Sequence, residues 1–393
     1  MLKAIITDPI RQVVCGAQHS LFLKDQQVYV CGSSYYGQCG YQGTATYDDD
    51  DENGAITEPT PVAGIPSMFQ SENVKAIAAG DFHSLILYEN GKLLTFGSGI
   101  LGLNNELYDS MPQEVSYFSD IKRKVVQIAA KGTISMALAH SVDDKNFLEP
   151  YLWGYYRAGK DGWRKSLHPV LIQHALKMDK IYSLLPGLDG TFAIMGDMGK
   201  KRIIQIYSDT KSSRMRIPQS PKYAEVPNVT EVYTNPPIME LEYPLGHVDE
   251  ADLGKGMLMI KTRTGNFIQG SLRVVQLIHL ESQECHTFDS IESALPYKIC
   301  LTHDFAVICA SNSVFAWRLP PLPPMKEEPL KFTFKYVFPW FDKKAEEEKV
   351  EEDDISWIRY VKEFQPHKIP TPGYPICASG YDHYFTYSKT SKE

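Results

Sequence analysis

The sequence lacks the patterns of disulfide-bonded, zinc-binding and membrane-spanning proteins. Its seven cysteines are an odd number and no two have C-x-x-C spacing, which argues against a zinc site or a disulfide framework. No run of about 18 apolar residues is present, so we expect no membrane span. Asp8 and Pro9 interrupt the N-terminus before a signal peptide could form. Free, buried thiols predict a reducing, intracellular compartment. As a separate expectation, we favour the cytoplasm or the cilium over the nucleus.

Catalytic motifs and an excess of basic charge are lacking as well. There is no P-loop, no G-x-G-x-x-G between a strand and a helix, no H-E-x-x-H and no G-x-S-x-G. We therefore predict that the chain is not an enzyme and that it uses no metal and no cofactor. The net charge is −8 and the basic clusters are short, which argues against nucleic acid as a direct partner.

A repeated pattern is what the sequence does contain. VVCGAQHSLFLKDQQVYVCGSSYYGQCG (13–40) and AIAAGDFHSLILYENGKLLTFGSGILG (76–102) share an apolar run, Gly-x-x-His-Ser, a second apolar run, a turn and a third apolar run that ends in glycine. One such unit cannot bury its apolar faces alone, so repeats of this kind stack on one another.

Five further units keep the hydrophobic frame while losing parts of the motif. In the third unit Ile134 stands at the histidine position, and in the fourth Gly190 stands there. Seven units in 393 residues give about 56 residues each, which fits a blade of four short strands. A string of separate small β-domains is the alternative. The positions equivalent to the first glycine of the motif, which we call anchors, are Gly16, Gly80, Lys131, Gly187, Gly254, Thr302 and Gly380.

The fold class predicted is therefore all-β: a single seven-bladed β-propeller of four-stranded blades over residues 1–393. The last unit is short, and the N-terminal stretch Leu2–Thr7 is a spare strand that we expect to complete that blade and remove its open edge. The motif histidines are predicted to hydrogen-bond backbone groups between strands. The residues to which we assign a structural role in the repeat are Gly16, His19, Gly32, Gly37, Gly40, Gly80, His83, Gly97, Gly102, Gly380 and His383.

These motifs resemble the regulator of chromosome condensation repeat family of seven-bladed propellers. The likeness is strong in the first two units, degenerate in the fourth to sixth, and marks a divergent member. The founding member is an exchange factor for the small GTPase Ran, whereas other members are docking platforms, so the resemblance does not define the function.

One segment favours the exchange function. The resemblance matches Trp153, Gly154, Tyr156 and Arg157 to the loop that the exchange factor projects toward its GTPase. The polar residues after Arg157 do not match, and an ordinary blade turn is the alternative. The candidate partner-binding residues of this loop are Tyr155, Tyr156, Arg157 and Trp163.

Two insertions interrupt the regular units. TYDDDDENGAI (46–56) is either a solvated loop or a site for calcium or a basic partner. The larger insertion, 318–374, lies between the sixth and seventh units, and its alternating KFTFKYVF reads as an outer strand of the sixth blade. Residues 342–365 predict a helix with an apolar face, which covers either the propeller or another subunit. The candidate partner-binding residues of the whole insertion are Trp340, Trp357, Ile358, Val361 and Phe364.

Two functions remain compatible with the sequence. The first is a non-enzymatic interaction platform or architectural subunit of an intracellular complex, including ciliary, cytoskeletal and organellar assemblies, with other proteins as partners. The alternative is a guanine nucleotide exchange factor or effector of a small GTPase. The alternative needs no catalytic side chain, because exchange works by displacing the contacts of the bound nucleotide.

Overall fold

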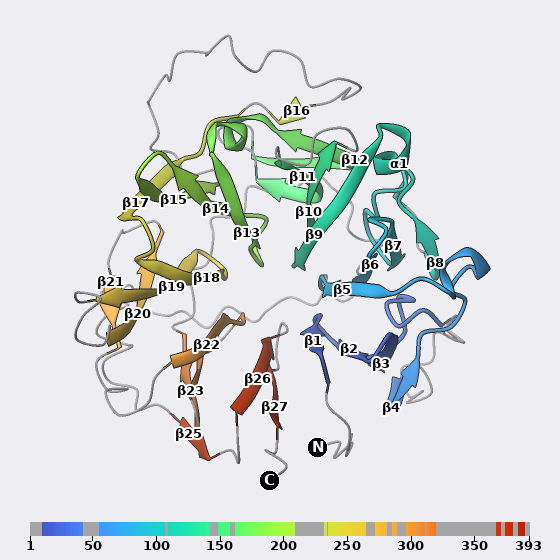
Figure 1. Cartoon of the computed structure of the whole chain (residues 1–393). Coiled ribbons are helices and arrows are strands. Elements are labelled where there is room, and N and C mark those ends of the chain that lie inside the picture. The colour runs from blue at the N-terminus through green and yellow to red at the C-terminus, as the bar shows by residue number, and fades with distance from the viewer. Residues whose placement is uncertain are drawn as a thin grey trace, which may run out of the picture.

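The computed structural model is an all-β propeller in which the sheets are arranged around a central axis (Figure 1). The described residues are 10–41, 55–106, 109–141, 148–157, 162–208, 232–233, 235–264, 272–280, 285–288, 296–303, 305–310, 313–319, 367–370, 374–379 and 384–389.

Seven inner strands surround the axis, each one in contact with the next, and the seventh contacts the first. They are β1 (Gln12–Cys15), β5 (Val74–Ala79), β9 (Arg123–Lys131), β13 (Lys180–Pro186), β18 (Val248–Leu253), β22 (Pro296–Leu301) and β26 (Tyr374–Ser379).

The first three sheets continue outward from these strands by antiparallel pairing. The first contains β2 (His19–Lys24), β3 (Gln27–Ser33) and β4 (Ala55–Pro61), and the second contains β6 (His83–Tyr88), β7 (Leu93–Gly97) and β8 (Asp109–Glu114). The third contains β10 (Ile134–Ser141), β11 (Leu148–Arg157) and β12 (Trp163–Ile172), and β16 (Val232–Tyr233) joins β12 in parallel as a fifth strand. The helices described beside these sheets are short: η2 (Ser67–Phe69), α1 (Tyr117–Asp120) and η4 (Gln173–Lys177).

The remaining sheets follow the same plan. The fourth contains β14 (Phe192–Met198), β15 (Lys201–Tyr207) and β17 (Met239–Pro244), and the fifth contains β19 (Met257–Thr264), β20 (Leu272–His279) and β21 (Cys285–Thr287). The sixth contains β23 (Phe305–Ala310), β24 (Ser313–Arg318) and β25 (His367–Pro370), and the seventh pairs β26 only with β27 (Tyr384–Lys389).

The expectation of seven four-stranded blades is therefore corrected. The described residues form six complete blades, and the two strands of the seventh sheet occupy the gap between the sixth blade and the first. The spare strand expected at Leu2–Thr7, which was to complete the last blade, lies outside the described residues, as do the acidic loop 46–54 and the helix expected in 342–365.

The segment expected as an insertion, 318–374, contains a strand of the sixth blade near its end. Its last part, β25, is the fourth strand of the sixth sheet, because Val314 of β24 pairs with Ile369. The outer strand described for this blade is therefore β25, and residues 320–366, which contain the KFTFKYVF segment predicted for that place, lie outside the described residues.

The hydrophobic core lies between adjacent blades. Both faces of a second strand are covered by its neighbours, so every residue of β6 is buried, as the continuous apolar sequence HSLILY predicts. One cluster joins Leu21 and Val30 of the first blade to Ile77 and Phe96 of the second. This packing places the turn after each inner strand at a fixed point beside the axis.

Candidate functional site

Every anchor outside the seventh sheet has the same place in its blade. The residue either ends the inner strand, as Lys131 does, or directly follows it. In the described blades other than the third, its backbone N–H donates to a carbonyl at the start of the second strand or one residue before it, as from Gly80 to His83 at 2.9 Å and from Gly254 to Met257 at 2.8 Å. The described anchors thus form a ring of tight turns around one mouth of the axis, as the repeat predicted.

The fourth blade departs from the alignment expected for it. Its anchor Gly187 donates to the carbonyl of Thr191 and Pro186 pairs with Phe192. Its turn therefore has one extra residue, and Thr191, not Gly190, occupies the position of the motif histidine. Phe192 consequently stands where the first three blades carry serine.

The two described motif histidines join adjacent blades. His19 Nε2 lies 2.9 Å from Ser84 Oγ of the second blade, and His83 Nε2 lies 2.7 Å from Ser135 Oγ of the third. Ser84 uses its one proton to donate to the carbonyl of Gln38 at 2.7 Å, so the imidazole of His19 donates to Ser84. The sequence predicted backbone partners, whereas these bonds connect side chains of successive blades.

Burial keeps the imidazole of His83 neutral. It lowers the pKa of His83 from 6.5 to about 4, because a charged ring would lose its hydration in the core. Burial, neutrality and the bond to a hydroxyl of the next blade fit the structural role predicted for His83.

The glycines assigned a structural role occupy turns and close contacts. At Gly97 φ is +115°, and a Cβ there would lie 2.3 Å from the carbonyl oxygen of Phe82. Gly32 pairs with His19 as Gly97 pairs with His83, and Gly37, Gly40 and Gly102 have positive φ in the turns that follow. Gly380 and His383 lie outside the described residues.

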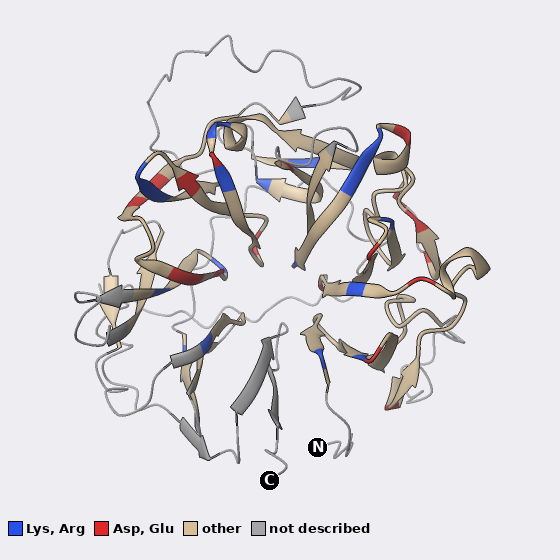
Figure 2. Ribbon diagram, in the orientation of Figure 1, with Lys and Arg blue, Asp and Glu red and all other residues tan. Residues whose placement is uncertain are grey.

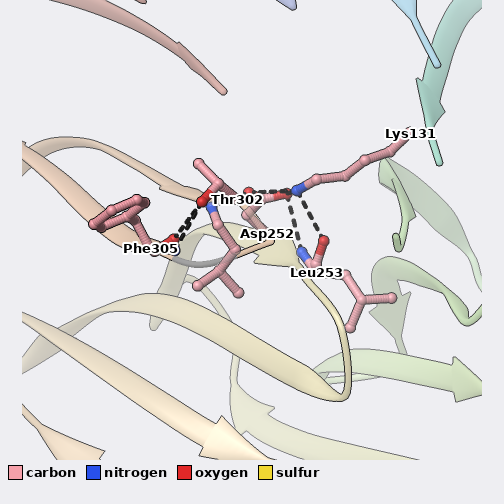
Figure 3. Close-up of polar contacts among 6 residues, drawn as sticks. Lys131, Asp252, Leu253, Thr302 and Phe305 are labelled. Atoms are coloured by element: carbon pink, nitrogen blue, oxygen red, sulfur yellow. Dashed lines mark hydrogen bonds and ion pairs between the residues drawn. The ribbon is translucent and has the colours of Figure 1, made fainter. Parts of the chain in front are cut away.

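An ion pair crosses the mouth of the axis. Lys131, at the inner end of β9 in the third blade, lies 3.0 Å from both carboxylate oxygens of Asp252 on β18 in the fifth blade (Figure 3). Its ammonium also donates to the carbonyl of Leu253 at 2.9 Å. Figure 2 shows acidic residues along β18, the strand that carries Asp252. The sequence signal was a lysine at a position that is glycine in most other units.

The segment expected to be a loop that contacts a GTPase is a strand. Trp153–Arg157 is the second half of β11, and Arg157 pairs with Trp163 across the hairpin to β12. Trp153 is fully buried, and Tyr156 and Arg157 are only 6% and 8% exposed. Tyr155 and Trp163 are half-buried.

Contacts with the fourth blade hold this hairpin in place. Arg157 Nε donates to the carbonyl of Asp189 at 2.8 Å, and its guanidinium lies 5.1 Å from the Trp163 ring. That ring lies against Gly190, where a Cβ would come within 2.4 Å of it. Tyr156 packs edge-on against Phe192 and Tyr233. Tyr156 and Arg157, which the resemblance matched to the exchange loop, therefore make contacts between blades.

The second group of candidate residues is not described by the structure. Trp340, Trp357, Ile358, Val361 and Phe364 lie outside the described residues.

Most of the cysteines that the structure describes are buried thiols. Six cysteines are free, and burial raises the pKa of Cys15 and of Cys39 to about 12. Within the described ranges, no group of three or more His, Cys, Asp or Glu side chains could hold a metal ion. A search of the same residues finds no helix with the length and hydrophobicity needed to cross a membrane.

Sequence comparison identifies the repeat. Two family models of the regulator of chromosome condensation (RCC1) repeat match the chain, one over residues 25–87 and the other over 10–38 and 74–102. Both fall on the first two blades, where the Gly-x-x-His-Ser motif is intact.

Curated relatives share this repeat over part of their length. The ultraviolet-B receptor UVR8 of Arabidopsis thaliana is 26% identical over 41% of this chain and 33% of its own. The human X-linked retinitis pigmentosa GTPase regulator is 28% identical over 35% of this chain and 12% of its own. The matched residues thus span a third or less of these relatives.

Solved structures match over almost the whole chain. Human WBSCR16 has a TM-score of 0.61 at 16% identity and covers 98% of this chain and 89% of its own. Prp20p of Saccharomyces cerevisiae has a TM-score of 0.56 at 16% identity and covers 94% of this chain and 80% of its own. At such identities the likeness concerns the fold alone. Together with the repeat matches, it makes the chain an RCC1-repeat β-propeller.

Proposed function

We propose that this propeller is a non-enzymatic platform for protein–protein interaction, an architectural subunit of an intracellular complex whose partners are other proteins. The observation that carries the proposal is the burial of Tyr156 and Arg157 in contacts between the third and fourth blades. Side chains engaged in this way cannot reach a GTPase unless the hairpin leaves the core. On this reading the β11–β12 hairpin stabilises the propeller, and partner proteins bind to other surfaces.

The residues proposed for that binding are those of the insertion: Trp340, Trp357, Ile358, Val361 and Phe364. The sequence around the last four has the apolar spacing of an amphipathic helix, and such a face needs a surface to cover it. We propose that the surface belongs to another subunit.

Exchange or effector function on a small GTPase is the second candidate. Tyr155 and Trp163 remain half-buried on the β11–β12 hairpin, and the adjacent Arg164 is exposed. Prp20p, whose fold is similar, has binding properties toward Gsp1p and histones, and one curated relative is named as a GTPase regulator. The hairpin residues would give a GTPase an aromatic and basic contact surface.

The test is affinity purification of the tagged full chain from its own cells, with the co-purifying proteins identified and the native mass measured. The proposal predicts a stable set of subunits that is lost from the W357A/F364A variant and kept by Y155S/R164A. Fractionation of the same cells checks the predicted cytoplasmic or ciliary compartment.

A second measurement separates the two candidates directly. Purified protein is added to Gsp1p loaded with a fluorescent GDP, and nucleotide release is followed. The platform function predicts no acceleration. Acceleration that is lost in Y155S/R164A, together with recovery of a GTPase released by added GTP, would overturn it.

A further inference from the structure

The link between motif histidine and serine stops at the third blade. His19 binds Ser84 and His83 binds Ser135, but the third blade carries Ile134 at the histidine position. The fourth blade carries Phe192 where the serine would be, and Ile134 and Phe192 belong to the same apolar cluster. Donor and acceptor are therefore lost together at one blade boundary.

Loss of the histidine also leaves room for a side chain at the third anchor. In the second blade the imidazole of His83 lies over Gly80, and a Cβ there would be 2.0 Å from His83 Cε1. The first blade has the same arrangement, since a Cβ added at Gly16 would lie 2.1 Å from His19 Cε1. With isoleucine at position 134 no imidazole lies over the anchor, and Lys131 is accommodated.

Lys131 then makes a contact that no glycine could make. Its ammonium meets two carboxylate oxygens of Asp252 and one carbonyl oxygen, which satisfies its three donors. The ion pair joins the third blade to the fifth. The side chains of Lys131 and Asp252 are only 13% and 23% exposed, so solvent screens their attraction less than that of a surface pair.

Asp252 extends the connection to the sixth blade. Its Oδ2 accepts the backbone N–H of Leu301 on β22 at 2.6 Å. The neighbouring anchor turn is closed within the sixth blade, where the Phe305 N–H donates to Thr302 Oγ1 at 2.7 Å (Figure 3). One carboxylate thus receives a cation from the third blade and an amide from the sixth.

We propose that Lys131 and Asp252 form an axial tie that takes over from the histidine–serine link and holds the third, fifth and sixth blades around the axis. The Lys131–Asp252 pair begins at the third blade, where isoleucine replaces the motif histidine. The histidine–serine hydrogen bond that joins the first blade to the second and the second to the third is therefore missing between the third and the fourth. This inference does not depend on the proposed function.

The experiment is a double-mutant cycle with K131M, D252N and the double variant, measured by thermal unfolding of the full chain. Each single variant should lower the midpoint by roughly 2–6 °C, and the double variant should lower it by less than the sum of the two. The matched control is the ion pair of Lys92 and Glu114 within the second blade, 3.3 Å apart, whose lysine side chain is 36% exposed against 13% for Lys131. K92M and E114Q should have small effects there.

Two further variants distinguish charge from packing. K131R keeps the cation and should keep most of the stability, whereas K131G, which restores the glycine of the repeat, should be as harmful as K131M. Hydrogen exchange should locate the effect, with the amides of Leu253 and Leu301 exchanging roughly tenfold faster in K131M. Additive single variants, or a K131G protein as stable as the unmodified chain, would overturn the proposal.

Discussion

Tyr233 lies edge-on to Phe192, with the ring centroids 5.4 Å apart and an interplanar angle of 74°. Phe192 in turn stacks on Tyr207 at 4.7 Å with the planes 6° from parallel. Tyr233 belongs to β16, which pairs with the outer strand of the third blade, whereas Phe192 and Tyr207 belong to the fourth blade. One ring therefore fastens two blades to each other.

Replacement of Tyr233 by alanine should destabilise the protein by about 3–5 kcal/mol, because a fully packed aromatic ring is lost from the core. The measurement is the midpoint of denaturant unfolding. Tyr233→Phe is the control: it keeps the ring and loses only the hydrogen bond to Asn235, which should cost about 1 kcal/mol. Equal losses in the two variants would show that the hydroxyl, not the ring, fastens the blades.

Gly80→Ala should cost about 2–3 kcal/mol, because the new methyl group has no room beside the imidazole of His83. The same substitution in a His83→Ala background should be tolerated, since the obstructing ring is gone. Urea unfolding of the four proteins gives the coupling between the two sites. Additive losses would contradict the contact described for Gly80 and His83.

Acidification should destabilise the chain through His83. Burial lowers the pKa of His83 to about 4 in the folded protein, so the unfolded chain binds more protons between about pH 6.5 and pH 4, and stability falls as the pH falls through this range. The loss contributed at pH 5 should be about 2 kcal/mol relative to pH 8.

The check on this prediction is the pH dependence of the unfolding free energy in His83→Gln, which should be shallower than that of the unmodified chain. His247→Gln, at an exposed position, serves as the control and should leave the slope unchanged. An unaltered slope in His83→Gln would assign the acid sensitivity to other groups.

Alkylation should distinguish the described cysteines. Cys285 is exposed, whereas Cys15 and Cys39 are buried with the pKa of each raised to about 12, and only the thiolate reacts. Iodoacetamide at pH 8 should therefore modify Cys285 first and the two buried thiols only after unfolding, as peptide mass spectrometry can follow. Rapid modification of Cys15 in the native protein would contradict its burial.

The ring of anchors could be predicted because it rests on a local pattern. A strand, a tight turn and a second strand leave their signature within about a dozen residues, and this signature survives even where Thr302 replaces the glycine. The fourth blade shows the limit of such an alignment, since one extra residue moved Thr191 into the place assigned to Gly190.

Contacts between blades could not be predicted in the same way. Lys131 and Asp252 are 121 residues apart, and nothing near either residue specifies the other. The burial of Arg157 likewise depends on the carbonyl of Asp189 in the next blade. The resemblance to the repeat family suggested a projecting loop at Arg157, with an ordinary blade turn as the alternative, whereas the segment is a strand that pairs with β12 in its own sheet.

The parallel strand β16 has a consequence for the order in which the chain can fold during synthesis. The third sheet has its first four strands once Ile172 has been made, but its fifth strand arrives only with Val232 and Tyr233, after three strands of the fourth blade. A nascent chain therefore cannot finish the third sheet before most of the fourth exists. The two blades mature together, and a fragment ending between them would emerge from the ribosome with an outer edge that its own residues cannot cover.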